Sequence, residues 1–99
     1  MKIDFSQAIT DLDGNVVKEN SEAMSLWSVC VNVLLTPLEG DKLLEGKDKV
    51  EHLKLAERIY KQNEVEVAVE ELSLLKKRIC KLYSTLPAGR AMALLEREI

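Results

Sequence analysis

Apolar and polar residues alternate at the start of the chain. Ile3 and Phe5 are apolar, whereas the residues beside them are polar. An Asp-Gly dipeptide follows at 13–14, and such dipeptides readily adopt the positive φ angles of a tight hairpin turn. We therefore predict a β-hairpin in which residues 2–10 pair with residues 15–18. An isolated hairpin is barely stable in water, so it should pack on the rest of the chain.

A polar connector at residues 19–24 leads into the most regular apolar pattern of the chain. Ser21 or Ser25 can cap a helix there, because a serine oxygen accepts a hydrogen bond from an N–H group of the first turn. The helix should end before Pro37, since the residue before a proline avoids helical backbone angles. The spacing i, i+3, i+4, i+7 and i+8 predicts one buried stripe and a central position. This stripe comprises Leu26, Val29, Cys30, Val33 and Leu34.

A second helix is predicted after a loop at residues 37–47. Asp48 offers an N-cap and Glu51 follows at the capping-box spacing. Asn63 is the expected left-handed stop. We expect lone His52 at the surface. The predicted inner stripe comprises Val50, Leu53, Ala56, Ile59 and Tyr60.

Two more helices follow a short alternating run at residues 64–67, which is a candidate third strand for the hairpin. Helix 68–83 has its acids near the start and its bases near the end, as the helix dipole favours. Its predicted inner residues are Leu72, Leu75, Ile79 and Leu82. Pro87 suits the first turn of a final helix. That helix carries Ala88, Ala91, Met92, Leu94 and Leu95.

Together these elements predict an α+β fold that is mainly α. The N-terminal β-hairpin should pack on a four-helix orthogonal array. The length of 99 residues suits one domain, 1–99, with the hairpin at 1–18 and the helical part at 25–97. The final helix is apolar around much of its surface, which favours either docking on the third helix or formation of a homodimer.

Charge is divided unevenly along the chain. The formal net charge is −3. Residues 1–48 carry four Lys and nine Asp or Glu, which gives −5, and residues 49–99 carry ten Lys or Arg and eight Glu, which gives +2. Proteins that coat nucleic acid present a broad cationic face, so the acidic half argues against this class.

Cys30 and Cys80 both lie within apolar helical patterns. The opening residues lack the apolar core of a signal peptide. These features predict two free, buried thiols in a reducing cytoplasm. No apolar run approaches the roughly 20 residues that a membrane span needs, so no membrane contact is expected. A metal site is not expected, because His52 is the only histidine and no CxxC pair occurs.

Catalytic and cofactor motifs are also missing. Neither a GxSxG elbow nor a phosphate-binding glycine loop occurs, so we predict neither an enzyme nor a bound cofactor. Asp11, Asp13 and Asn15 are spaced like early ligands of a calcium loop, and Glu22 stands at the twelfth place. The glycine, however, falls at the fourth place rather than the sixth, which favours a hairpin turn.

Two features are candidates for binding a partner. Trp27, the sole tryptophan, lies off the main stripe of its helix and is either a core residue or an anchor for a partner. Five bases without an intervening acid form the second candidate, either a solvated helix face or a basic patch. They are Lys76, Lys77, Arg78, Lys81 and Arg90.

The sequence resembles small proteins encoded by tailed bacteriophages and prophages. The resemblance rests on residues 1–6, 11–14, 29–35 and 63–67, with Glu71-Leu72 and Lys76-Lys77 after them. One departure is Ala68, where the pattern has Thr or Ser. The resemblance points to no catalytic residue.

The resemblance implies a phage accessory protein of the host bacterial cytoplasm that acts by protein–protein interaction with a phage or host protein. Two roles fit, a head or tail assembly factor and a host-directed, counter-defence inhibitor. The alternative is a nucleic-acid or nucleotide binder that uses the basic third helix, and nucleic acid is the less favoured partner.

Overall fold

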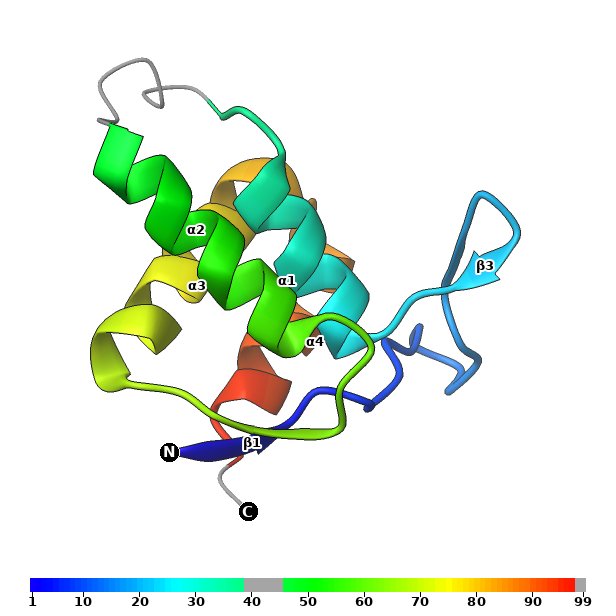
Figure 1. Ribbon diagram of the computed structural model, residues 1–99. Coiled ribbons are helices and arrows are strands. Elements are labelled where there is room, and N and C mark those ends of the chain that lie inside the picture. Colours follow the sequence, from blue (N-terminus) through cyan, green and yellow to red (C-terminus); the bar gives the residue numbers. More distant parts are fainter. Residues whose placement is uncertain (39–45, 98–99) are drawn as a thin grey trace.

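The computed structural model describes residues 1–38 and 46–97. The helices within these residues are α1 (Leu26–Leu35), α2 (Gly46–Ile59), α3 (Val69–Leu82) and α4 (Thr85–Leu95). The strands are β1 (Lys2–Asp4), β2 (Lys18–Glu19), β3 (Glu22–Ala23) and β4 (Glu64–Glu66). The predicted class, α+β and mainly α, is confirmed (Figure 1).

Helix α1 is fixed at its N-terminus by both local capping and the N-terminal segment. Ser25 Oγ accepts a hydrogen bond from Ser28 N–H, and Ser28 Oγ accepts one from Ser25 N–H. The N–H groups of the first two helical residues donate to the carbonyl oxygens of Gln7 and Phe5 at 2.8 and 2.9 Å. The orphan donors that every helix start leaves are therefore satisfied. The helix ends before Pro37, as predicted.

The N-terminal segment divides its pairing between two partners. β1 pairs antiparallel with β4, with Ile3 opposite Val65, which confirms the third strand. The predicted pairing of residues 2–10 with 15–18 exists only beside the turn, where Thr10 bridges Val16 and Val17 N–H donates to the Ile9 carbonyl oxygen at 2.8 Å. The rest of that prediction is wrong. Ile3 and its neighbour Phe5 are fully buried, and pairing with β4 holds this stretch against the core.

Residues 19–24 form a second small hairpin rather than a connector. Lys18 pairs with Ala23 and Glu19 with Glu22. Between them the backbone takes φ angles of 52° and 69°, as in the mirror-image turns that suit twisted hairpins. This hairpin has almost no apolar alternation, so its hydrophobic pattern gave no signal for a strand.

Helix α2 begins and ends at other residues than predicted. It starts at Gly46, so Asp48 lies in the first turn instead of at the N-cap. Its carboxylate still favours the positive end of the helix dipole. The left-handed residue after the helix is Lys61, with φ of 54°, and not Asn63. Asn63 instead extends the β1–β4 pairing, because its carbonyl oxygen accepts Phe5 N–H at 2.7 Å.

The buried side of α2 also differs from the predicted stripe. His52, Leu55, Ala56 and Ile59 are buried, so the surface position expected for His52 is wrong. Two stripes of helical spacing overlap on this helix, the predicted one with Leu53 and the observed one with Leu55. Both stripes contain Ala56 and Ile59. α2 is oriented so that Leu55 joins the core, and Arg58 on the neighbouring side forms a salt bridge with Glu71 of α3. The outer side then carries the other predicted residues, Val50, Leu53 and Tyr60. Leu43 and Leu44 of the predicted loop lie outside the described residues.

Helices α3 and α4 largely follow the predicted pattern. Leu72, Leu75 and Ile79 are buried, whereas Leu82 is half-buried. Ala68 caps α3 without a side-chain oxygen, and Glu71 Oε1 instead accepts Ala68 N–H at 2.8 Å. On α4 the small residues Ala88 and Ala91 are buried together with Leu95.

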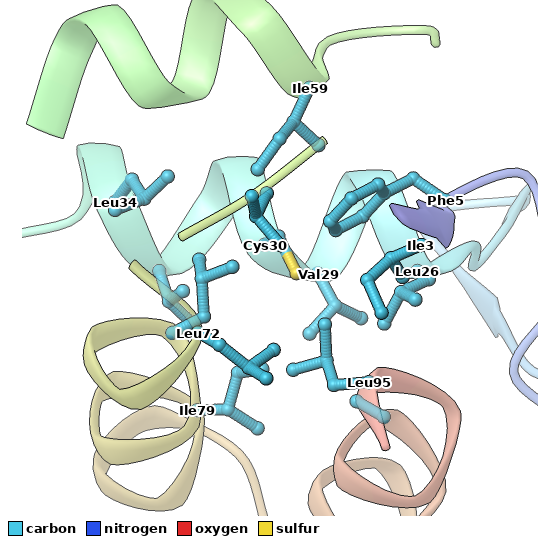
Figure 2. Close-up of a cluster of buried hydrophobic side chains, with 14 of the residues drawn as sticks. Ile3, Phe5, Leu26, Val29, Cys30, Leu34, Ile59, Leu72, Ile79 and Leu95 are labelled. Carbon is cyan, nitrogen blue, oxygen red and sulfur yellow. The ribbon is translucent and has the colours of Figure 1, made fainter. Parts of the chain in front are cut away.

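The core gathers around α1. Its predicted stripe is buried in full, from Leu26 to Leu34. Figure 2 shows α1 between Ile59 of α2 on one side and Ile79 of α3 and Leu95 of α4 on the other, with Phe5 filling one end. A core built this way needs few aromatic residues, and Phe5 is its only fully buried aromatic side chain among the described residues.

Candidate protein-interaction surface

The predicted basic patch is not assembled, because Arg78 points into the protein. This side chain is buried, with 6 % of its surface exposed. Its Nε–H donates to the Val33 carbonyl oxygen at 2.6 Å, and Nη2 donates to the Thr36 carbonyl oxygen at 2.9 Å. Arg78 therefore caps the C-terminus of α1 and is unavailable to an outside partner.

Arg90 and Lys76 are also engaged within the protein. Arg90 lies on α4 and donates to the carbonyl oxygens of Thr10 and Asp11, both at 3.1 Å. Lys76 pairs with Glu96 at 3.3 Å. Lys77 and Lys81 remain exposed on α3, with no ion pair to another described residue. Two lysines are too few for the broad cationic face that duplex binding requires.

Trp27 is half-buried and joins the start of α1 to the end of α2. Its ring meets Tyr60 edge-on, with centroids 5.3 Å apart and planes inclined by 84°. This is a favourable aromatic geometry. The ring also packs against the core, so Trp27 is neither fully internal nor free. Because this contact places the first turn of α1 beside the last residues of α2, the two helices run antiparallel (Figure 1).

An apolar surface follows the seam between these two helices. On α1, residues 27, 31 and 35 recur every fourth position and so lie on one side of the helix. On α2, residues 50, 53 and 60 share the outer side described above. Leu35 is 56 % exposed, and Val50, Leu53 and Tyr60 are each 50 % exposed. We call this surface the α1–α2 face. It comprises Trp27, Val31, Leu35, Val50, Leu53 and Tyr60.

The sequence pattern assigned the α2 half of this face, Val50, Leu53 and Tyr60, to the interior. In the structure Arg58 lies on the side of α2 that faces α3, where it forms a salt bridge with Glu71. One turn of helix covers 3.6 residues, so Leu53 then lies about 140° around the helix from Arg58, on the side away from α3. That choice depends on a contact between separate helices, which hydrophobic periodicity does not contain.

A hollow of about 400 Å³ lies between α2 and the start of α3. Leu55, Leu74 and His52 line it together with charged residues of both helices. Partial burial tends to raise the pKa of Glu71 there, but the hydrogen bond from Ala68 N–H and the Arg58 guanidinium outweigh burial and lower it. The salt bridge thus links α2 to α3 beside this hollow.

A smaller hollow of about 170 Å³ lies beside the β2–β3 hairpin. Tyr83 borders it, and its hydroxyl oxygen accepts a hydrogen bond from Asn32 Nδ2 at 2.7 Å. Burial raises the pKa of Tyr83, and the nearby carboxylate of Glu19 acts in the same direction. Asn32 Oδ1 also accepts a bond from Thr36, so this network ties α1 to the end of α3.

The two thiols differ in environment. Both cysteines are free, and Cys30 is buried as predicted. Burial raises the pKa of the Cys30 thiol well above its ordinary value. Cys80 is exposed, so its predicted burial is wrong. It follows Ile79 directly, and a single step along a helix rotates a side chain by about 100° away from the buried side.

The residues that resemble a calcium loop form a turn. Asp11 Oδ1 accepts the N–H groups of Asp13 and Asn15 at 2.9 and 3.0 Å. Gly14 supplies the positive φ angle, 86°. The carboxylate of Asp11 is therefore directed at the backbone of its own loop. Across residues 1–38 and 46–97, no group of three or more His, Cys, Asp or Glu is placed to hold a metal ion.

In the same part of the chain, no helix has the length and apolarity to cross a bilayer. Comparison with known proteins found no matching family, no similar curated protein and no similar solved structure.

Proposed function

We propose that this protein is a non-enzymatic interaction module whose α1–α2 face docks onto another protein. The observation that carries the proposal is the half-exposure of Leu35, Val50, Leu53 and Tyr60 along one seam. Isolated exposed apolar residues are ordinary, but a contiguous apolar surface on a small protein is typical of a binding site. The aromatic pair at one end supplies the residue types that contribute most to binding energy at interfaces.

The biological setting is proposed from the sequence resemblance. We place the protein among phage or prophage accessory proteins that act in the host bacterial cytoplasm. A head or tail assembly factor and a host-directed, counter-defence inhibitor both act by presenting a surface to a phage or host protein. The α1–α2 face supports either role equally.

Crosslinking from position 53 tests the docking function. A photo-crosslinking amino acid replaces Leu53 in bacteria that carry the phage, and a second strain has it at Leu12. Leu12 is an exposed leucine outside the face, with 87 % of its surface accessible. We expect a defined adduct from position 53 only, and mass spectrometry would identify the partner.

Binding to the purified partner then gives the decisive measurement. Leu53→Asp should weaken binding by roughly tenfold or more, because a charge would enter a desolvated contact. Leu12→Asp should leave the affinity unchanged. Equal crosslinking from both positions, or equal affinity of the Leu53→Asp and wild-type proteins, would overturn the proposal.

A further inference from the structure

The hollow of about 170 Å³ beside the β2–β3 hairpin is formed by three separate parts of the chain. The hairpin forms one wall, Ser28 and Asn32 on successive turns of α1 form another, and Tyr83 after α3 completes it. Met24 is the one buried residue of the lining and marks its inner side. Figure 1 shows the hairpin projecting from the helices beside the start of α1, so a ligand can reach the hollow from outside.

Two carboxylates stand opposite each other on the hairpin wall. Glu19 and Glu22 are partners in the β2–β3 ladder, and both line the hollow. The positive φ angles of Asn20 and Ser21 form the turn that fixes this register. Directly opposite residues of an antiparallel pair have Cβ atoms about 5 Å apart, and like charges at that spacing destabilise a hairpin. The hollow therefore holds two negative charges in an unfavourable arrangement.

Within the described residues, no base offsets these charges. The lining contains neither lysine nor arginine, and neither glutamate forms an ion pair with another described residue. Lys18 precedes Glu19 in the strand, and successive side chains point to opposite faces of a strand. Lys81, close to Tyr83 in sequence, is exposed and does not line the hollow. A cation from outside would relieve the repulsion between the two carboxylates.

Tyr83 supplies a fixed aromatic wall. Its hydroxyl oxygen accepts a hydrogen bond from Asn32 Nδ2 at 2.7 Å, and Asn32 is itself held by Thr36. Burial and the nearby carboxylate of Glu19 raise the pKa of Tyr83, so the hydroxyl is neutral at physiological pH. A planar guanidinium group stacks on aromatic rings and binds carboxylates, and this wall offers both contacts.

The size of the hollow selects a single side-chain group. Liquid water occupies about 30 Å³ per molecule, so the hollow has roughly the volume of six waters. Sites for drug-sized ligands have about 300–1,000 Å³, which excludes a nucleotide or a similar cofactor. The guanidinium fork can donate to two carboxylates at once, whereas an ammonium group is a compact and strongly hydrated point charge.

We propose that this hollow binds the guanidinium group of an arginine side chain from another protein. The group lies between Glu19 and Glu22, donates to both carboxylates and stacks beside Tyr83. Free arginine is disfavoured, because it carries a carboxylate of its own and no base lines the hollow to receive it. The site lies outside the α1–α2 face, so this inference goes beyond the proposed docking function and does not depend on it.

Titration with a blocked arginine tests the site in the intact protein. N-acetyl-arginine amide is added at low salt, and the backbone amide NMR shifts of Asn20, Ala23 and Asn32 report binding. We expect saturable shifts with a Kd on the order of millimolar, because the carboxylates are exposed to water. N-acetyl-lysine amide and free arginine should each bind roughly threefold more weakly or worse. The uncharged isostere N-acetyl-citrulline amide should not bind.

Paired variants locate the binding and control for net charge. Glu19→Gln, Glu22→Gln should weaken binding of the blocked arginine by roughly tenfold or more. Glu57→Gln, Glu70→Gln removes the same charge from two exposed positions elsewhere and should leave binding unchanged. The hairpin variant should be no less stable than the wild type in urea unfolding, since it removes a like-charge contact. Lost binding would then not reflect unfolding.

Four outcomes would overturn the inference. Equal weakening in the two double variants would show general attraction to an acidic chain. Equal affinity for the lysine compound would contradict the preference for a guanidinium group. Tighter binding of free arginine would assign the hollow to a small molecule. Absence of shifts with blocked arginine would remove the site, and crosslinking from position 53 would still judge the α1–α2 face separately.

Discussion

Arg78 on α3 binds the backbone of α1 at Val33, with its Nε–H donating to the Val33 carbonyl oxygen at 2.6 Å. The same guanidinium donates to the Thr36 carbonyl oxygen. Carbonyl groups in the last turn of a helix have no partner within the helix and carry partial negative charge. A buried cation placed there satisfies them and also fixes α3 against the end of α1.

Replacing this arginine should destabilise the fold. Arg78→Met keeps much of the side-chain volume but leaves the two carbonyl oxygens without their charged donor. We therefore expect the free energy of unfolding to fall by about 2 kcal/mol. Urea unfolding followed by circular dichroism measures the free energy of unfolding. Lys77→Met, one residue away and exposed, should change it by less than about 0.5 kcal/mol. Equal losses in the two variants would contradict the capping role of Arg78.

Arg90 should stabilise the turn at Asp11 in a local way. Arg90→Lys cannot reproduce both hydrogen bonds to the carbonyl oxygens of Thr10 and Asp11. We expect the free energy of unfolding to fall by about 1 kcal/mol. Amide hydrogen exchange at Asp11 and Asn15 should become faster. Exposed Arg97 provides the control, since Arg97→Lys should affect neither quantity. Unchanged exchange in Arg90→Lys would show that the turn holds without the arginine.

An alkylating reagent should modify the two thiols one after the other, Cys80 before Cys30. Cys80 is exposed, whereas Cys30 is buried with a raised pKa. Iodoacetamide should therefore modify Cys80 in the native protein and reach Cys30 only after unfolding, because the thiolate is the reactive form and must be accessible. Mass spectrometry of peptides locates the label. In Cys80→Ser, native labelling should disappear, and rapid native labelling of Cys30 would contradict the described core.

The Arg58–Glu71 pair should make stability depend on pH in the acidic range. The folded-state pKa of Glu71 lies below its ordinary value of 4.5. A lowered pKa means that the carboxylate stabilises the fold above about pH 4.5 and that this contribution is lost as the pH falls through the folded-state pKa. Glu71→Gln should thus cost about 1 kcal/mol at neutral pH and little at about pH 2.

Glu70→Gln is the matched control for this measurement, because Glu70 is the exposed neighbour in the same helical turn. Replacing Glu70 should change the free energy of unfolding only slightly at either pH. A cost for Glu71→Gln that persisted unchanged at low pH would show that the carboxylate charge is not responsible.

Nucleic-acid binding should be weak or absent at physiological salt. Arg78 and Arg90 bind backbone carbonyls, which leaves Lys77 and Lys81 as the main exposed bases of the predicted patch. Fluorescence anisotropy with a labelled duplex of about 20 base pairs measures this. Tight, salt-sensitive binding that Lys77→Ala and Lys81→Ala weaken would favour the nucleic-acid alternative over protein docking.

Sequence by itself determined the elements whose signals are local. The stripe from Leu26 to Leu34, the stop before Pro37 and the turn at Gly14 each depend on side-chain spacing or backbone preference within a few residues. The candidate strand at Val65 also followed from alternation. These features were predictable because the residues that decide them are neighbours in the chain.

Tertiary structure decided the rotation of α2 and the roles of the arginines. Leu53 and Leu55 are equivalent in hydrophobicity, and the packing of α2 on α1 places Leu55 in the core and leaves Leu53 half-exposed. From its sequence context Arg78 is typical of a solvated base. Only the folded structure places the unpaired carbonyl groups at the end of α1 beside it. The candidate docking face therefore emerged from packing, because its exposure depends on how two helices meet and not on the pattern of either helix alone.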